Sequence, residues 1–303
     1  MSTNDWQGRT AVITGAASGF GLETARLAAA KGMNVVMADV MDEPLAAAVK
    51  QIEALGAQVL PFKCDVRHAA EVEALGAATF ARFGAPHFVF NNAGVGAGGL
   101  IWEHTARDWE WVMGVNVMGV AHGVRVFTPM MLAAEKADPA FRGHIVNTAS
   151  MAGLVSMPNM GVYNVSKHAV VTLSETLYQD LALVSDRVHA HVLAPYFVPT
   201  GIAHSERARP QDAHDDARKA TTSQRVAQGL IEKAVATGRV TAADVAQFVF
   251  DALDANRFYI YSHPKALAPV MTRAEDIMAA RNPSDPYAER PELGEQLRAA
   301  LRR

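Results

Sequence analysis

The chain has 303 residues, of which 50% are hydrophobic and 19% are charged, so an intrinsically disordered chain is excluded and a large core can form. The formal net charge of −3 gives no basic surface of the size that nucleic-acid backbones require, so no nucleic-acid partner is expected. The single Cys64 cannot form an internal disulfide, and the scattered histidines form no ligand motif, so we expect no metal site.

Short runs rich in Val, Ile, Leu and Ala alternate with segments of helical period from residue 9 to about 195. This alternation is typical of parallel strands crossed by helices, and several runs are apolar throughout because helices cover both sheet faces. The expected strands are 10–14, 34–39, 58–62, 87–91, 144–148, 188–193 and 258–261. The expected helices are 21–31, 44–55, 69–83, 108–134, 162–183 and 242–253. The fold class is therefore α/β, with a doubly wound Rossmann-type parallel sheet of about seven strands.

Two segments depart from this pattern. From Ala203 onward, HSERARPQDAHDDARKATTSQR brings charges of both signs and few apolar residues, which indicates a mobile surface insertion at about 201–240. A tail at about 263–303 begins near Pro264 and contains five prolines, so short helices and turns are expected there. We interpret both as additions to one domain, 1–303, whose core covers about 8–262.

The first chemical signal is TGAASGFG, which follows the first expected strand and opens the first expected helix. Glycines there permit a tight turn and close approach of backbone to a pyrophosphate at the helix N-terminus. The loop residues expected to contact a dinucleotide are Gly15, Ser18, Gly19, Phe20 and Gly21. The alternative is an ordinary tight turn between a strand and a helix.

Asp39 ends the second expected strand, where a carboxylate can accept hydrogen bonds from the adenosine ribose hydroxyls. The same charge would repel a 2′-phosphate by about 4 kcal/mol at 4 Å and an effective dielectric of about 20. The glycine loop contains no Arg or Lys, and Val40 follows Asp39. NAD is therefore favoured over NADP, the alternative being that Asp39 only caps a helix.

Tyr163 and Lys167 are four residues apart, so they share one face of an expected helix. A free phenol has a pKa near 10 and is a poor proton shuttle at neutral pH. A neighbouring ammonium group and a positive nicotinamide would lower that pKa and make Tyr163 a general acid or base. Taken alone, the pair is more often a solvated helix pair.

The coincidence of motifs decides between these interpretations. Ser150 ends the run GHIVNTAS before Tyr163, NNAG at 91–94 follows the fourth expected strand, and Asn116 lies in VNVMG. With TGAASGFG and YNVSK in this order and spacing, the chain resembles the compact branch of the short-chain dehydrogenase/reductase family over about residues 8–200. The spacing of the glycine loop, T-G-x-x-x-G-x-G, differs from that of the extended branch.

The resemblance implies roles for residues of this sequence. Ser150 would bind the substrate oxygen, Tyr163 would transfer the proton, Lys167 would hold the nicotinamide ribose and lower the Tyr163 pKa, and Asn116 would anchor a water that links Lys167 to solvent. Asp65 would meet the adenine amino group, and Asn91 would stabilise the strand beside the cofactor. Further cofactor contacts are implied at Val66, Asn92, Ala93, Gly94, Pro195, Val198 and Thr200.

One position departs from the family. The family has Pro-Gly after the sixth strand, and this chain has Pro195-Tyr196. Tyrosine does not reach positive φ easily, and it brings an aromatic ring next to the site. The backbone path at this loop is therefore the part of the resemblance that transfers least directly.

The residue types around the motifs bear on the substrate. Expected pocket residues are Trp102, Met151, Met157, Tyr196 and Phe197. If the loops bring them together, the pocket is wide and apolar and suits a bulky cyclic, aryl, terpenoid or steroid-like alcohol. The alternative is that these side chains only pack under loops.

We therefore expect an NAD-dependent enzyme that interconverts a secondary alcohol and a ketone. The alternatives are an NADP-linked ketone reductase and a non-catalytic NAD-binding sensor or scaffold. The first residues, MSTNDWQGRTAVITG, lack a basic segment followed by an apolar one, so a cytoplasmic protein without membrane association is expected. The resemblance implies a homotetramer or a homodimer.

Overall fold

Seven parallel strands form one sheet in the order β3-β2-β1-β4-β5-β6-β7. The strands are β1 (Thr10–Thr14), β2 (Asn34–Asp39), β3 (Val59–Lys63), β4 (Phe88–Asn91), β5 (Gly143–Thr148), β6 (Val188–Ala194) and β7 (Tyr259–Tyr261). This computed structural model describes residues 5–213 and 219–302. The predicted α/β class is confirmed, and every predicted strand boundary lies within one residue of the observed one.

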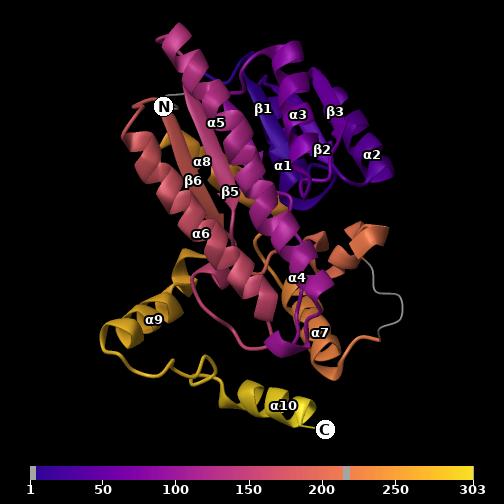
Figure 1. Cartoon of the computed structure of the whole chain (residues 1–303), viewed down its shortest axis with the longest axis vertical. Coiled ribbons are helices and arrows are strands. Elements are labelled where there is room, and N and C mark those ends of the chain that lie inside the picture. The colour runs from indigo at the N-terminus through magenta and orange to yellow at the C-terminus, as the bar shows by residue number, and fades with distance from the viewer. Residues whose placement is uncertain (1–4, 214–218, 303) are drawn as a thin grey trace.

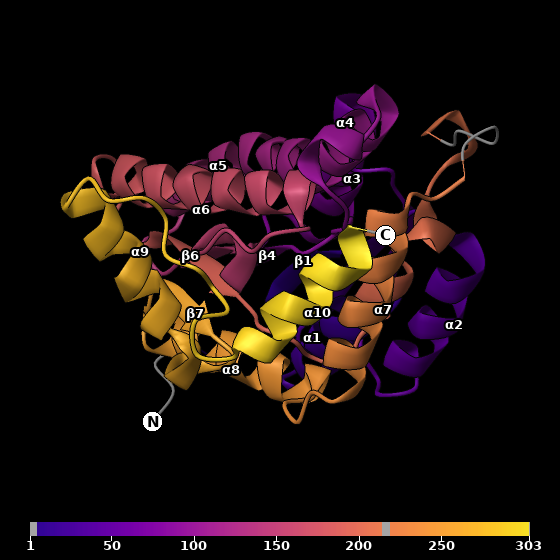
Figure 2. The ribbon, with the colours of Figure 1, turned by 90° about the horizontal axis from the view of Figure 1, so that it is seen from below.

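Helices cover both faces of the sheet (Figure 2). One face carries α1 (Gly19–Ala30), α2 (Asp42–Glu53) and α8 (Ala242–Asp254); the other carries α3 (Ala69–Phe83), α5 (Gly119–Ala137) and α6 (Gly161–Ala182). Each face buries its own apolar cluster, which explains why most of the strands are apolar on both sides. The strand order reverses between β1 and β4, so the crevice at their carboxyl ends is where ligands of this architecture bind.

A single helix was predicted at 108–134, and the structure divides it. The short helix α4 (Ala106–Met113) continues through a π-helical turn, Gly114–Met118, into α5. The stretch Ala106–Ala137 is long and apolar enough to cross a membrane by length and composition. This is weak evidence for a membrane span, because α5 packs against α3, β4 and β5 as the core helix of a globular domain does.

The predicted mobile insertion at 201–240 is largely helical where the structure describes it. It forms two 3-10 helices, Gly201–Ala208 and Gln211–Ala213, and then α7 (Thr222–Ala236). The N-terminus of α7 has a capping box, in which Thr221 and Gln224 each bind the other's backbone N–H. The prediction overlooked α7 because its apolar face is narrow and its first turn is polar. Residues 214–218 lie outside the described part of the chain.

The tail forms a 3-10 turn, Pro264–Ala266, and two helices, α9 (Ala268–Met278) and α10 (Pro291–Leu301). Short helices and turns were predicted here. Figure 1 shows both helices beyond the lower end of the sheet, and α10 contacts α7. The tail therefore reaches the end of the molecule that carries α7 and the loops that contain Leu100 and Pro158.

A pair of buried histidines joins β5 to β6. The Nδ1 atom of His144 lies 3.1 Å from Nε2 of His191, and Nδ1 of His191 lies 2.9 Å from the carbonyl oxygen of Arg257. Because a carbonyl can only accept, His191 donates through Nδ1 and accepts through Nε2 in its neutral form. Protonation of His191 would place an N–H at its Nε2 opposite the N–H at Nδ1 of His144, and the hydrogen bond between the rings would be lost. Burial lowers the pKa of His191 to about 4.

We therefore expect acid to destabilise the fold through His191. Its pKa is lower in the folded chain than in the unfolded one, so its contribution is present above about pH 6.5 and is lost as the pH falls toward 4. The free energy of unfolding is expected to fall by about 3 kcal/mol in total. Urea unfolding of the wild type and of His191→Gln between pH 7 and 4 measures it. Parallel pH dependence in the two proteins would show that His191 is not responsible.

Candidate active site

The glycine loop connects β1 to α1 with backbone geometry that requires glycine. Gly15 and Gly19 have positive φ, of 64° and 56°. A Cβ atom on Gly21 would lie 2.2 Å from the carbonyl oxygen of Gly15, so the helix can approach the turn only without a side chain there. The first turn of α1 has no acidic residue and no side-chain cap, so its N–H groups can bind an anion such as a pyrophosphate.

The loop is held by β4 through Thr14, which the sequence analysis did not single out. The hydroxyl oxygen of Thr14 accepts the backbone N–H groups of Asn92 and Ala93, at 3.0 and 3.1 Å. The side-chain amide of Asn92 in turn donates to the carbonyl oxygen of Thr14, at 3.0 Å. Asn92 and Ala93 thus hold the glycine loop in place through Thr14. Thr14 opens the motif TGAASGFG, and this position in the motif could have indicated the contact.

Asp39 stands at the end of β2 with its carboxylate fixed by the glycine loop. One oxygen accepts the N–H of Ala17 and the other that of Met41, both at 3.0 Å. Met41, not Asp39, is the N-cap of α2, so the alternative of a simple helix cap does not hold. Burial raises the pKa of Asp39, while the backbone N–H groups and the positive charge of Arg207 oppose that rise. Each oxygen keeps a lone pair that a ribose hydroxyl could use.

Asp65 has a partner that the resemblance did not indicate. Both of its oxygens bind the guanidinium of Arg67, at 2.7 to 3.1 Å, and Arg67 also reaches Asp212 of the second 3-10 helix at 3.2 Å. A contact between adenine and this carboxylate would share oxygens that Arg67 already uses.

Val66 is buried against Gly119 of α5, where a Cβ would lie 2.6 Å from a Val66 methyl group. Phe20 likewise packs into the core.

Tyr163 and Lys167 lie one turn apart at the N-terminal end of α6. The ammonium nitrogen of Lys167 is buried, donates to the carbonyl oxygen of Thr148 at 2.8 Å, and lies 5.7 Å from the centre of the Tyr163 ring. Gly94 lies next to this group, since a Cβ there would be in contact with it at 3.4 Å. The structure therefore brings the phenol and the ammonium group to one end of the sheet, beside the loop after β4.

Ser150 completes this group from the end of β5. Its hydroxyl forms a hydrogen bond with the phenol of Tyr163 and lies 3.4 Å from the carbonyl oxygen of Pro195. It also accepts the N–H of Ala152, at 3.1 Å, which fixes the side chain in the turn after the strand. The two hydroxyl groups can bind one substrate oxygen between them.

The protein's own groups do not lower the Tyr163 pKa as the sequence analysis expected. Burial raises the pKa of this phenol, and the hydrogen bond with Ser150 offsets only part of the rise. Burial also lowers the pKa of Lys167 to about 7, which weakens its positive field at neutral pH. A positively charged nicotinamide bound beside the phenol would add to this field.

Asn116 lies in the π-helical turn between α4 and α5, not in a regular helix as predicted. Its side-chain oxygen accepts the N–H of Val95 at 2.8 Å, and its amide donates to Val95 O and to Ser166, each at 3.0 Å. The side chain is thus committed to holding the loop after β4. Any water between Lys167 and solvent would bind another atom of this turn, and π-helical turns often occur at functional sites.

The loop after β6 accommodates Tyr196 without strain. Its φ is not positive, and its N–H donates to the hydroxyl of Ser262 at 2.9 Å. The ring is 48% exposed and packs edge-on against Phe197. Val198 is buried, and the side chain of Thr200 faces Gly19 across the crevice. The departure from Pro-Gly therefore changes the loop surface and not the direction of the chain.

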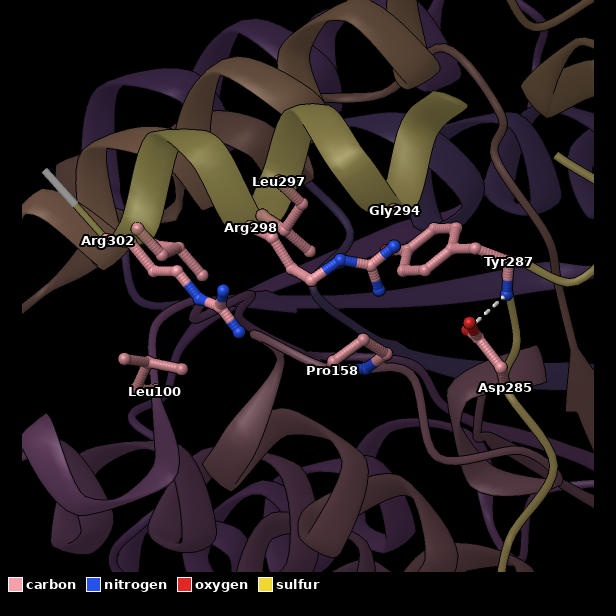
Figure 3. Close-up of a pocket in the computed structure, with 9 residues that line it drawn as sticks. Leu100, Pro158, Asp285, Tyr287, Gly294, Leu297, Arg298 and Arg302 are labelled. Carbon is pink, nitrogen blue, oxygen red and sulfur yellow. Dashed lines mark hydrogen bonds between the residues drawn. The ribbon is translucent and has the colours of Figure 1, made fainter. Parts of the chain in front are cut away.

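The expected substrate residues differ in their exposure. Trp102 is 76% exposed, Met151 is buried in the turn after Ser150, and Met157 is partly exposed. A pocket lies between α10 and two loops (Figure 3). The loop after β4 contributes Leu100, and the loop after β5 contributes Pro158. Leu297 and the guanidinium groups of Arg298 and Arg302 reach it from α10. The tail thus contributes to the surface outside the crevice.

The segment after Thr200 is fastened over the crevice by residues that the sequence analysis missed. Ser205 accepts the N–H of Gly96 at 2.9 Å, and Ser223 accepts that of Leu100 at 3.0 Å. Arg209 binds Asp108 of α4 at 2.7 Å and stacks on the Trp111 ring. Both hydroxyl contacts fall on the loop after NNAG, so the segment covers the substrate side of the crevice.

The sequence and the fold are similar to those of known proteins. A sequence model described as short chain dehydrogenase matches residues 9–211. The chain belongs to the short-chain dehydrogenase family. A crystal structure of a short-chain dehydrogenase/reductase from Burkholderia phymatum in complex with NAD is 51% identical, with a TM-score of 0.90 over 94% of this chain and 99% of that one.

Two dehydrogenases of stated activity are also similar. The CLA biosynthesis dehydrogenase/reductase of Lactiplantibacillus plantarum is 35% identical and covers 86% of this chain and 90% of its own. The 2,5-dichloro-2,5-cyclohexadiene-1,4-diol dehydrogenase of Sphingobium indicum is 36% identical and covers 69% and 80%. The protein is therefore an oxidoreductase of the short-chain dehydrogenase family, with a Rossmann-like fold.

Proposed function

We propose that this short-chain dehydrogenase uses NAD to interconvert a secondary alcohol and a ketone on a bulky, largely apolar substrate. The observation that carries the proposal is the hydrogen-bonded pair Ser150 and Tyr163, with Lys167 one helical turn away. These groups stand at the crevice that also holds the glycine loop and Asp39. A non-catalytic sensor would need the cofactor loop but not the proton-transfer group.

The residues divide the chemistry between them. When bound, NAD+ accepts the hydride from the carbinol carbon. Ser150 orients the substrate hydroxyl, and Tyr163 takes its proton as the carbon–oxygen double bond forms. Lys167 holds the ribose and supplies positive charge near the phenol. The products are the ketone, reduced cofactor and one proton that leaves through Tyr163.

The preference for NAD follows from Asp39. Its carboxylate is buried at the end of β2 beside the glycine loop, and a 2′-phosphate bound there would meet a negative charge. The NAD complex of the Burkholderia phymatum protein supports this assignment. The glycine loop itself supplies no Arg or Lys that could neutralise a 2′-phosphate.

The substrate class is proposed from the surface around the crevice. Leu100, Pro158 and Leu297 give a largely apolar pocket outside the crevice, which Arg298 and Arg302 also line, and the related dehydrogenase from Sphingobium indicum acts, by its name, on a ring diol. A cyclic or aryl alcohol would bury ring carbons there, whereas a small polyol would leave its hydroxyl groups unpaired.

A fluorescence screen for NADH tests this proposal. Purified protein with NAD+ is offered matched sets of cyclic or aryl secondary alcohols and small polyols, and we expect at least about tenfold higher kcat/KM for the ring alcohols. Higher kcat/KM on polyols would contradict the substrate class. Absence of turnover on every alcohol and on the corresponding ketones with NADH would favour the sensor alternative.

We also propose that α5 and α6 form the contact between subunits of a homotetramer or a homodimer. Apolar side chains on this side of the molecule are exposed, among them Met118, Val165 and Tyr178. Val165 and Tyr178 belong to α6 and Met118 directly precedes α5, and exposed apolar surface of this kind is typical of a subunit interface.

A further inference from the structure

Arg207 reaches from the covering segment back to the glycine loop. Its Nη2 atom lies 3.4 Å from the hydroxyl of Ser18, which is the N-cap of α1. The guanidinium group lies directly on the backbone of Gly201, where a Cβ atom would be only 2.1 Å from Nη2. The 3-10 helix that starts at Gly201 thus brings a cation to the glycine loop, and a Cβ at position 201 would require the guanidinium group to shift.

The electrostatic setting of Arg207 is unfavourable without an anion. The N-terminus of a helix carries partial positive charge, and a cation placed there is destabilised. Among residues 5–213 and 219–302, no carboxylate forms an ion pair with Arg207, whereas its neighbour Arg209 binds both Asp108 and Glu206. The carboxylate that feels its charge is Asp39, which already accepts two backbone N–H groups. Two positive groups, Arg207 and the N-terminus of α1, thus meet on one side of the crevice, and Asp39 is the carboxylate that lies near them.

We propose that Arg207 binds the pyrophosphate of the dinucleotide and so ties the covering segment to the bound cofactor. This rests on the proposed use of NAD. The glycine loop would supply backbone N–H groups from one side, and the guanidinium of Arg207 would supply charged donors from the other. Thr200 lies next to Gly19, so the segment that carries Arg207 starts beside the glycine loop.

The contacts of the covering segment give this residue a second effect. Ser205, two residues before Arg207, binds the N–H of Gly96, and Gln228 of α7 binds the carbonyl oxygen of Ala203 at 2.6 Å. The segment that carries Arg207 is therefore joined to the loop after β4 and to α7. A diphosphate held by Arg207 would stabilise the covered form of the crevice before the alcohol binds.

Calorimetric titration tests the assignment with two ligands that carry the diphosphate and one that lacks it. The full-length wild type, Arg207→Gln and Arg207→Lys are titrated with NAD+, ADP-ribose and adenosine. We expect Arg207→Gln to weaken binding of NAD+ and ADP-ribose about tenfold and to leave adenosine unchanged. Lysine keeps the charge but not the planar pair of donors, so a smaller loss is expected for Arg207→Lys. Arg225→Gln, on α7, is the matched control and should bind all three ligands as the wild type does.

The outcomes separate this inference from the proposed function. A wild type that binds neither NAD+ nor ADP-ribose would contradict the function itself. Normal affinity of Arg207→Gln for ADP-ribose would overturn the role of Arg207 and leave the function standing. An equal loss for adenosine would also overturn it, because the residue would then act on the ribose side through Asp39.

Discussion

Tyr163→Phe is expected to reduce turnover by about a thousandfold or more while the affinity for NAD+ stays within about twofold of the wild type. General acid or base catalysis contributes about 10²- to 10⁴-fold, and the hydroxyl of Tyr163 is the one group placed to exchange a proton with an oxygen that also binds Ser150. The ring that packs beside Lys167 is kept in phenylalanine, so the fold and the cofactor crevice are preserved. Initial rates of NADH formation and a separate NAD+ titration measure the two quantities.

The matched control is Tyr178→Phe, on the same helix. Tyr178 is 41% exposed and packs against Phe258, away from Ser150, so its loss should leave turnover unchanged. Near-normal turnover of Tyr163→Phe would remove the proton-transfer role. Equal losses in both variants would point to a defect of α6 and not to chemistry.

Asp39→Asn is expected to shift the cofactor preference toward NADP+ by about a hundredfold, measured as the ratio of the two dissociation constants. One charge pair at 4 Å and an effective dielectric of about 20 corresponds to about 4 kcal/mol, and the charge of Arg207 offsets part of it. Asparagine keeps the shape of the side chain but accepts through only one oxygen. One backbone hydrogen bond to Ala17 or Met41 is lost, so a decrease in stability of about 1 kcal/mol should accompany the shift.

Asp42→Asn provides the comparison for the cofactor titrations. This carboxylate stands three residues further along, is well exposed and pairs with Lys63, so its removal should leave both dissociation constants unchanged. A wild type that already binds NADP+ as tightly as NAD+ would contradict the assignment. So would an Asp39→Asn variant whose preference is unchanged.

The fold could be predicted closely because its signals are local. The runs 10–14 and 34–39 are apolar and bounded by turn residues, and the strands β1 and β2 have the same limits. The break between α4 and α5 could not be predicted in this way. It coincides with hydrogen bonds from Asn116 to Val95, which lies 21 residues earlier on another element.

The site was predictable where spacing carries the chemistry, as for Tyr163 and Lys167 on one helix face. Its supporting contacts were not, because they join residues far apart in the chain. The pair Arg209 and Asp108 is separated by 101 residues, and Arg207 and Ser18 by 189. Their side chains are ordinary surface residues in the sequence, and only the path of the segment after Thr200 brings them to the crevice. The pKa of Tyr163 also escaped prediction, since burial raises it and the hydrogen bond with Ser150 offsets only part of the rise.

The central claim is that one crevice holds a dinucleotide between the carboxylate of Asp39 and the phenol of Tyr163. A crystal structure of the protein grown with NAD+ tests it most directly. We expect the ribose hydroxyls of the adenosine within about 3 Å of the Asp39 oxygens, and the nicotinamide facing the hydroxyls of Tyr163 and Ser150. Electron density that places the adenosine away from Asp39, or turns the Tyr163 ring away from the nicotinamide, would contradict the account.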